Sequence, residues 1–410
     1  MRKAHRSLGL GAALALVAGG MLAMVTPTVA SAAPAASPPC TVSATHVKST
    51  AHSLGIGGVI IAAGTSSTCA DPPPPPEPAF NGTPPLLFNG RPPTKNCVAG
   101  TVCDDGDVMG TRATGPVVLV PIFWAPSGYS FTSSYENIID EYLRDVAAAS
   151  GRLTNVFSVL TEYYGNNGVI NYRFQAGNPI TATNAFPTTG NCTVTAPDTS
   201  GIYTDGTGYT ACLDDNNLQA EVNTVTSTYG LPHNLNHIYE LFLPKHVEGC
   251  FFPGSDGAGN VCTINNQPSA AYCAYHSTSL SAAVYSSMNY PIYDSPTGFT
   301  CGTDARFPTE ESPNGNPDAD TEISPLSHET SESITDPDTE TGWYDSTGNE
   351  IGDDCAYIFG ATGGTAGALY NQTINGQHFI TQEEFSNRVF ARSNGTIGCV
   401  QNWLQEFPGA

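Results

Sequence analysis

The sequence predicts an α/β (α+β) fold, in which a mixed sheet and its helices carry a metal-site helix and loops stapled by disulfides. An apolar, β-branched run at 116–124 has the composition of a buried strand. Segments with apolar residues at helical spacing follow it and alternate with further strand-like runs. The chain also has 12 cysteines, an even number, which is typical of proteins from an oxidising compartment.

Residues 1–32 are predicted to be a secretory signal peptide. A basic start precedes an apolar run at 8–25, and the small residues at 30–32 suit a signal-peptidase cleavage site. No later stretch is long and apolar enough to span a bilayer. The sequence therefore predicts an exported protein without a membrane span.

Residues 33–110 are predicted to be a leader rich in Pro, Ala and Ser rather than part of a core. The run DPPPPPEP at 71–78 is typical of a stiff polyproline segment. The apolar piece at 56–64 lies between Cys40 and Cys69, so it can form a small hairpin closed by a disulfide.

The folded domain is expected at 111–405, beginning with the strand at 116–124. Ser133 and Glu136 match a capping box, so a helix is expected to run from Ser133 to about Gly151. The next elements are expected in the order helix 155–165, strand 170–177, helix 215–230 and strand 237–244. Strands that alternate with helices in this way predict an α/β core.

The C-terminal part of the domain is expected to contain longer loops and most of the site. The segment 272–291 begins and ends with strand-like runs. A last helix is expected from Thr381, where Glu384 would complete a capping box. Close cysteine pairs are expected to staple loops, although spacing does not fix their connectivity: Cys97 with Cys103, Cys192 with Cys212, and Cys250 with Cys262.

The chain is strongly acidic. It has 14 Lys and Arg against 37 Asp and Glu, and removing the three basic residues of the signal peptide leaves 11 − 37 = −26. A protein with this charge repels nucleic acid and anionic surfaces, and it attracts cations. The composition therefore argues against a nucleic-acid-binding function.

The stretch SHETSESITDP at 327–337 is the main candidate for chemistry. Ser324 suits a helix N-cap and Pro325 suits the first helical position. The Asp-Pro pair at the end of the stretch would stop the helix, which predicts a length of about 11 residues, close to the average. His328 and Glu332 are four residues apart, so they share one face of this helix.

The motif resembles the HExxH of metallopeptidases, with Glu332 in place of the second His. His328 and Glu332 would bind a metal ion, and Glu329 would serve as the catalytic general base. The third metal ligand is expected from the acidic run NEIGDDC, where Glu350 and Asp353 are alternatives. The competing interpretation is a solvated helix whose acids face water.

The segment YCAYHS supplies two further candidates. His276 is either a third ligand, a substrate-binding group or a hydrogen-bonded structural residue. Tyr275 and His276 are the candidates for an oxyanion donor. Asp336, just before Pro337, is expected either in a turn or as a carboxylate that orients a histidine.

In combination these motifs resemble the phosphate-induced protein 1 (EXORDIUM-like) family and its secreted bacterial relatives. The likeness covers roughly 115–403 and rests on Ser312 to Gly315, His328, Glu329, Glu332, Asp336-Pro337, Trp343-Tyr344, Glu350, Asp353 and Cys355. Plant members of that family are associated with the cell wall and growth control, so the resemblance implies an extracellular protein. The order of elements also resembles zincin metallopeptidases, which implies a zincin-like mixed sheet with a late third ligand.

The sequence therefore predicts a secreted metal-dependent hydrolase, similar to metallopeptidases, that cleaves peptide bonds with its HExxE helix. The expected cofactor is zinc or another divalent cation, with manganese or calcium as alternatives because the ligands are rich in oxygen. The expected partner is a peptide, protein or cell-wall substrate, and the expected state is a monomer. The alternative is a non-enzymatic extracellular or cell-wall-associated binding module with a structural metal or polar site.

Overall fold

The computed structural model describes the chain in segments. They are residues 40–41, 56–64, 84–90, 106–188, 201–250, 261–263, 272–279, 281–295 and 299–406. All of them belong to one compact unit, Ser37–Ala410. The expected signal peptide lies outside the described residues, as do the polyproline run and the pairing of Cys97 with Cys103.

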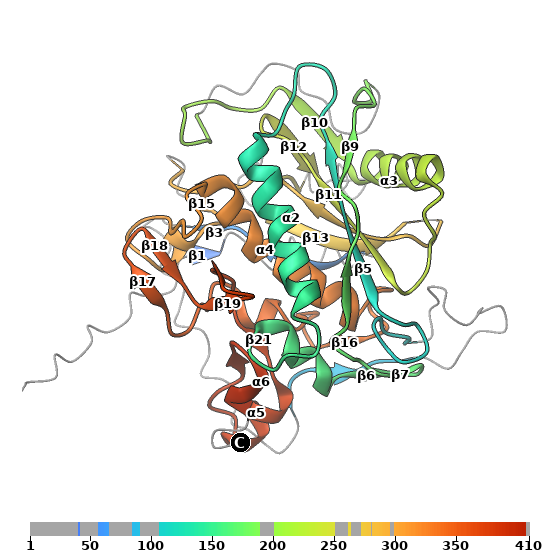
Figure 1. The fold of residues 1–410 in the computed structure, drawn as a ribbon, viewed down its shortest axis with the longest axis vertical. Coiled ribbons are helices and arrows are strands. Elements are labelled where there is room, and N and C mark those ends of the chain that lie inside the picture. The colour runs from blue at the N-terminus through green and yellow to red at the C-terminus, as the bar shows by residue number, and fades with distance from the viewer. Residues whose placement is uncertain are drawn as a thin grey trace, which may run out of the picture. The chain divides into compact units, whose positions relative to one another are not determined.

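A seven-stranded mixed sheet forms the centre of the fold (Figure 1). Its strands, in spatial order, are β2 (Ile56–Ile61), β13 (Tyr272–Thr278), β14 (Val284–Met288), β11 (His237–Phe242), β5 (Val117–Trp124) and β8 (Phe174–Ala176), and β9 (Ile180–Ala182) also pairs with β5. The strands from β14 to β8 and β9 run parallel, whereas β13 is antiparallel to both of its neighbours. The predicted strands at 116–124 and 237–244 and at both ends of 272–291 are confirmed.

Proline is rare inside central strands because it cannot donate a ladder hydrogen bond, yet Pro121 lies in the middle of β5. On one side, Pro121 is in register with Glu240 of β11. On the other side, β8 pairs with Val117–Leu119 and β9 pairs with Ile122–Trp124. The interruption between β8 and β9 falls opposite the proline, so the two short strands avoid the missing donor.

Helices cover both faces of the sheet (Figure 1). On one face α2 (Ser133–Ala148) packs against β8 and α4, and α4 (Pro317–Thr335) packs against β13, β14 and β2. On the other face α3 (Asp215–Tyr229) packs against β11. Two hydrophobic cores result, one under α2 and α4 and one under α3.

Capping explains where α2 and α3 begin and end. Thr132, rather than the expected Ser133, accepts the hydrogen bond that caps α2. Asp214 and Asn217 form a reciprocal capping box at the start of α3, and Gly230 ends that helix with a φ of 65°. The predicted helices at 133–151 and 215–230 are thus confirmed, with a shift of one residue at the first cap.

The segment 56–64 does not form the separate hairpin expected within a leader. Ile56–Ile61 is an edge strand of the main sheet, paired antiparallel with β13. Ile60 and Ala62 are buried in the core beneath α4. The expectation that 33–110 lies outside the core is therefore wrong for this strand. The sequence does not predict its position, because its pairing partner β13 is about 200 residues away and no local pattern reveals the pairing.

Two predicted helices also differ. The segment 155–165 forms the 3₁₀ helix η1 (Val156–Glu162). The expected helix from Thr381 begins only at α5 (Asn387–Arg392), which Ser386 caps, and the residues before it are extended in β21 (Glu384–Phe385). There the Phe385 amide donates to the carbonyl of Ile351, so a tertiary hydrogen bond replaces the helical one.

The remaining elements are short and lie in the connections. They are β1 (Cys40–Thr41), β3 (Ala63–Gly64), β4 (Leu87–Phe88), β6 (Tyr164–Gly165), β7 (Gly168–Val169), β10 (Ala211–Asp214), β12 (Val247–Cys250), β15 (Phe299–Thr300), η2 (Thr303–Ala305), β16 (Trp343–Tyr344), η3 (Asp353–Cys355), β17 (Gly363–Thr365), β18 (Ala368–Tyr370), β19 (Gln372–Ile374), β20 (Gln377–Phe379), β22 (Cys399–Val400) and α6 (Trp403–Glu406). Among the described residues, no helix is both long enough and apolar enough to cross a membrane.

Disulfides hold the loops of the described part of the chain. The expected pair Cys250–Cys262 is present, and two longer-range pairs, Cys273–Cys301 and Cys355–Cys399, accompany it. Cys212 is disulfide-bonded as well, and the expected pairing of Cys192 with Cys212 lies outside the described residues. The pair Cys355–Cys399 joins η3 to β22, which fixes the loop that carries the acidic run predicted to supply a ligand.

Helix α4 is longer than the motif predicts. Asn316 caps it and Pro317 takes the first helical position, so Ser324 and Pro325 lie in the helix interior. The predicted end is confirmed, since the helix stops at Thr335 before the Asp-Pro pair. Every residue from Ala319 to Thr335 is buried, and packing on all sides stabilises a sequence of low helix propensity.

Glu310, just before α4, is a buried carboxyl. The Thr321 hydroxyl donates to its Oε1 at 2.9 Å, and the Asp304 amide donates to its Oε2 at 3.1 Å. Burial, together with the negative charge of Asp304, raises the pKa of Glu310 from 4.5 to about 8. The folded protein therefore keeps a proton here that the unfolded chain has already released at neutral pH.

Because the folded state binds this extra proton between pH 4.5 and about 8, the free energy of unfolding should fall as pH rises through that window. We predict that Glu310→Gln will make the free energy of unfolding depend less steeply on pH in this window. The slope should decrease by the contribution of about one bound proton. Denaturant unfolding at several pH values measures it, with Glu141→Gln on the exposed side of α2 as the control. Equal slopes in the two variants would contradict the assignment.

Candidate metal centre

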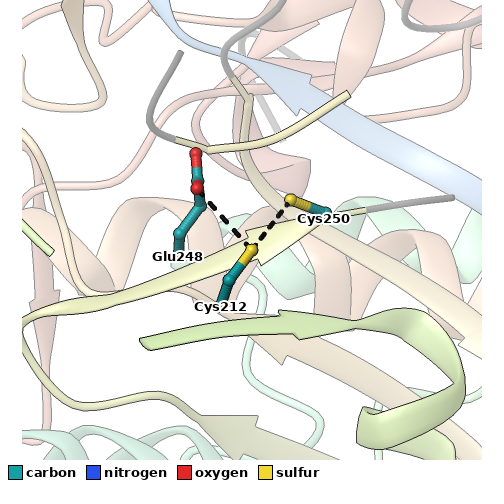
Figure 2. A group of neighbouring side chains, drawn as sticks. All are labelled: Cys212, Glu248 and Cys250. Atoms are coloured by element: carbon teal, nitrogen blue, oxygen red, sulfur yellow. Dashed lines mark hydrogen bonds between the residues drawn. The ribbon is translucent and has the colours of Figure 1, made fainter. Parts of the chain in front are cut away.

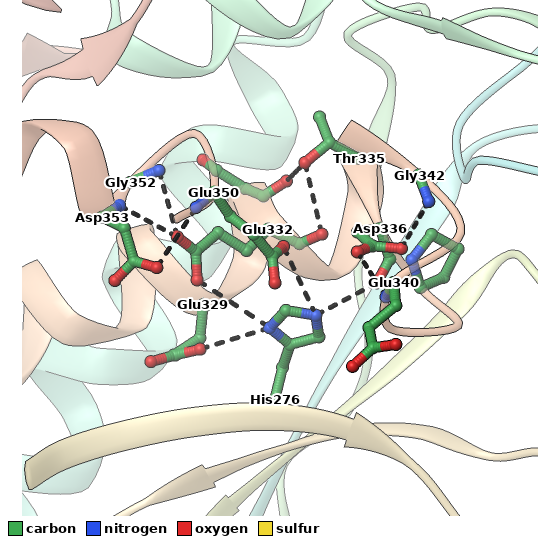
Figure 3. A network of polar contacts seen from close by, with 12 residues as sticks. His276, Glu329, Glu332, Thr335, Asp336, Glu340, Gly342, Glu350, Gly352 and Asp353 are labelled. Atoms are coloured by element: carbon green, nitrogen blue, oxygen red, sulfur yellow. Dashed lines mark hydrogen bonds and ion pairs between the residues drawn. The ribbon is translucent and has the colours of Figure 1, made fainter. Parts of the chain in front are cut away.

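Helix α4 brings the HExxE motif against the sheet. His328, Glu329 and Glu332 are all 0% exposed. Figure 3 shows Glu329 and Glu332 on the helix, with His276 reaching toward them from the strand below. The alternative of a solvated helix whose acids face water is therefore wrong, because none of the three side chains reaches solvent.

His328 and Glu332 meet as their spacing predicts. The Nε2 of His328 lies 2.9 Å from the Oε2 of Glu332. The Oδ1 of Asp353, from η3, lies 3.9 Å from the same nitrogen. These three residues each offer one ligand atom, and the three atoms lie within 4.8 Å of one another.

His276 joins the cluster from β13. Its Nε2 lies 3.1 Å from the carbonyl oxygen of Asp336, which can only accept, so this nitrogen carries the hydrogen. Its Nδ1 therefore carries the lone pair, and it faces the Oε2 atoms of Glu329 at 3.5 Å and Glu332 at 3.9 Å. A second ring nitrogen that donates to a carbonyl is the usual way in which a metal-binding histidine is oriented.

Glu350 completes a second group around His276. Its Oε2 lies 3.9 Å from the Nε2 of His276. Ligand atoms of His276, Glu332 and Glu350 also lie within 4.8 Å of one another. The sequence left Glu350, Asp353 and His276 as alternatives for the third ligand, and the structure brings all three into one cluster.

The loop that carries Glu350 and Asp353 is held by backbone contacts with the helix. The amides of Gly352 and Asp353 donate to the Oε1 of Glu332, at 3.1 and 3.0 Å (Figure 3). The side chain of Gln382 donates to the carbonyl of Gly352 at 2.7 Å. Glu332 thus uses one oxygen to fix the loop and turns the other toward the histidines.

Glu329 has no partner for its charge beyond the cluster itself. Within the described part of the chain, neither of its carboxylate oxygens has a hydrogen-bond partner. Burial raises its pKa well above the usual range, and the negative charges of Glu332, Asp353 and Glu350 raise it further. A carboxyl in this state is unfavourable when ionised unless a cation lies next to it.

The two histidines differ in their preferred charge. Burial lowers the pKa of His276 to about 4, so this ring is neutral at physiological pH and can bind a cation through Nδ1. Burial also lowers the pKa of His328, but the charge of Glu332 and its hydrogen bond outweigh burial and raise that pKa overall. The acidic surroundings of His328 thus attract a positive charge, which a metal ion would supply in place of a proton.

The cluster fits a divalent cation. Imidazole nitrogens and carboxylate oxygens are the ligands that zinc and manganese prefer, and buried carboxylates without a cation are costly. The Nδ1 of His276 and both oxygens of Glu329 are buried and lack hydrogen-bond partners among the described residues. His276, His328, Glu332, Glu350 and Asp353 are the residues that could hold the ion.

Tyr275 is not part of the centre. Residues adjacent in a strand point to opposite faces, and Tyr275 donates to the Oδ1 of Asp215 at 2.7 Å in the core beneath α3. Its proposed role as an oxyanion donor is therefore wrong. The alternation of side chains along a strand, applied to the YCAYHS run, would have placed Tyr275 and His276 on opposite faces of the sheet.

Asp336 acts through two groups. Its carboxylate accepts hydrogen bonds from the amides of Glu340, Thr341 and Gly342, which closes the turn after α4. Its backbone carbonyl, rather than its carboxylate, orients His276. The expected turn is thus confirmed, whereas the expected role of the carboxylate in orienting a histidine is wrong, because the backbone carbonyl takes that role and no sequence signal identifies it.

A second group of potential ligands, Cys212, Glu248 and Cys250, lies at β10 and β12 (Figure 2). Cys250 is bonded to Cys262, and Cys212 is also in a disulfide. Disulfide sulfurs carry no thiolate charge, so this group is not a metal site.

Gly352 lies so close to the ring of His328 that a larger residue at this position would disturb the proposed metal ligand. A Cβ on Gly352 would lie 2.6 Å from the Nδ1 of His328, so Gly352→Ala must displace the ring or the loop. We predict a loss of about 1–3 kcal/mol in the free energy of unfolding, together with weaker binding of divalent cations. Chemical unfolding and calorimetric titration measure the two effects.

The control is Gly363→Ala in the exposed strand β17, where the nearest atom to the new Cβ lies at 3.2 Å, on the ring of Tyr370. This variant should change neither quantity. If Gly352→Ala matched the control in both measurements, the close packing of the loop on His328 would be incorrect.

Comparisons with known proteins add no family or function to this geometry. No protein-family model matches the chain. No curated protein and no solved structure matches it either. The functional argument therefore depends on the residues of the cluster.

Proposed function

We propose that this protein is a metal-dependent hydrolase that cleaves peptide bonds. The observation that carries the proposal is Glu329, a buried carboxylate without a hydrogen-bond partner among the described residues, beside the metal-binding cluster. A structural cation site needs only its ligands, whereas a hydrolytic site needs an additional base. Glu329 follows His328 directly, as the base follows the first ligand in HExxH motifs.

His328 and Glu332 would hold the cation, with Asp353, Glu350 or His276 completing the site. A bound divalent cation supplies a Lewis acid that polarises the scissile carbonyl. Glu329 accepts the proton of the attacking water and later delivers it to the leaving nitrogen.

The identity of the cation follows from the donor set. Zinc suits the imidazoles, whereas the carboxylates also suit manganese and calcium. We propose zinc or manganese, since both accept mixed nitrogen and oxygen ligation, and calcium as the alternative if only carboxylates bind.

A second candidate function is a non-enzymatic extracellular binding module with a structural cation. The burial of Glu329 favours it, because this side chain is 0% exposed and a peptide cannot reach it unless part of the surrounding structure moves. A cavity of about 530 Å³ elsewhere also favours it. Among the described residues its lining includes Tyr129 and Phe186 together with Ser127, Thr183, Thr188 and Thr210, but no charged residue, which suits a neutral ligand such as a glycan.

The proposed setting is outside the cell. The disulfides of the described chain support export, because such bonds persist in oxidising compartments. The resemblance to the phosphate-induced protein 1 family and the likeness to zincins are part of the proposal, and the motifs at 312–355 support them. We propose a monomer that acts on peptides, proteins or cell-wall material, without a nucleic-acid partner.

The proposal predicts different effects for adjacent residues. Glu329→Gln should keep the fold and the bound cation but lower peptide hydrolysis by about 10²-fold or more, because only the base is removed. His328→Ala should lose the cation that His328 holds, and activity with it. Elemental analysis beside an assay on a quenched-peptide library measures both.

The control is wild-type protein treated with a chelator and then reloaded with zinc or manganese, which should regain activity. A protein that holds a cation but cleaves nothing in the library would favour the binding module. Equal losses of cation in the two variants would contradict the separate role of Glu329.

A further inference from the structure

Two ligand groups in the cluster share one residue. Glu332 belongs to the group with His328 and Asp353 and also to the group with His276 and Glu350. We propose that the centre holds two divalent cations, one in each group, with Glu332 as their common ligand. This inference rests on the proposed function only in requiring that the cluster binds cations.

Each group has the composition of a site by itself. Each contains one imidazole and one carboxylate of its own, and each uses the carboxylate of Glu332. One imidazole comes from α4 and the other from β13. A centre for one cation needs three or four protein ligands, so five residues of these types exceed that requirement.

The orientations of the two imidazoles support separate ions. The carbonyl of Asp336 holds the Nε2 of His276 and leaves its Nδ1 directed at Glu329 and Glu332. His328 instead presents its Nε2 to Glu332 and Asp353. With one cation on His328, the Nδ1 of His276 would remain a buried acceptor facing carboxylate oxygens, which is unfavourable.

Charge balance gives the same answer. Four carboxylates lie within ion-pair distance of the two imidazoles, namely those of Glu329, Glu332, Glu350 and Asp353. When ionised they carry four negative charges, which two divalent cations neutralise and one leaves half uncompensated. An uncompensated charge among side chains this deeply buried is unfavourable, so the ionised cluster favours the second ion.

Two ions would also explain the position of Glu329. Its Oε2 lies near the Nδ1 of His276, although the HExxH analogy pairs this base with the site of His328. With both groups occupied, Glu329 would lie beside Glu332, the ligand common to the two ions, rather than beside one ion only. Two-cation centres of hydrolases stabilise both the attacking and the leaving group, which suits peptide cleavage.

The test uses the full chain, stripped with a chelator and reloaded with Mn²⁺ alone. Elemental analysis should find two manganese ions per chain, and electron paramagnetic resonance should show a spin-coupled pair. His276→Ala and His328→Ala should each retain one ion and show the spectrum of an isolated ion. The control is His378→Ala on the exposed strand β20, which should retain both ions.

One ion per chain in the wild-type protein, with an uncoupled spectrum, would overturn the two-cation centre and leave the proposed hydrolase intact. No bound ion would overturn both proposals. The wild-type stoichiometry decides the question even if a histidine variant fails to fold, and circular dichroism identifies that case.

Discussion

Burial of charge on α4 is the constraint on which the rest of the structure depends. The helix is enclosed from Ala319 to Thr335, and its His328, Glu329 and Glu332 are fully buried. Removing such groups from water costs several kcal/mol each unless partners compensate them. The compensating groups come from β13, from the turn after the helix and from the loop at η3 (Figure 3). A cation would complete this arrangement, because most of the groups that surround Glu329 are also negative.

The architecture positions these partners through long-range connections. The pairing of β13 with β14 places His276 beneath the helix, and β2 covers the other edge of β13. The disulfide Cys355–Cys399 and the amide hydrogen bonds to Glu332 hold the acidic loop above it. Enclosure has two consequences for function. It strengthens electrostatic interactions inside the centre, and it requires movement before any peptide can approach Glu329.

Local sequence patterns predicted the parts of the fold and site that depend on residues close together in the chain, such as helix caps, β-branched runs and helical spacing. The β-branched run of β5 and the capped helices α2 and α3 were predictable, as was the shared face of His328 and Glu332. The start of α4 was not, because Asn316-Pro317 and Ser324-Pro325 are equivalent start signals and only tertiary packing places Pro325 in the interior. The positions of His276 and β2 depend on strand pairing across the chain, which spacing does not encode.

The central claim is that the buried cluster of α4, β13 and the η3 loop is a cation centre. Anomalous diffraction from crystals of the protein, collected on both sides of the zinc and manganese absorption edges, tests it directly. The account predicts anomalous density between Glu332 and the two histidines, His276 and His328. A well-ordered cluster without anomalous density, with direct hydrogen bonds between protonated carboxyls instead, would contradict it.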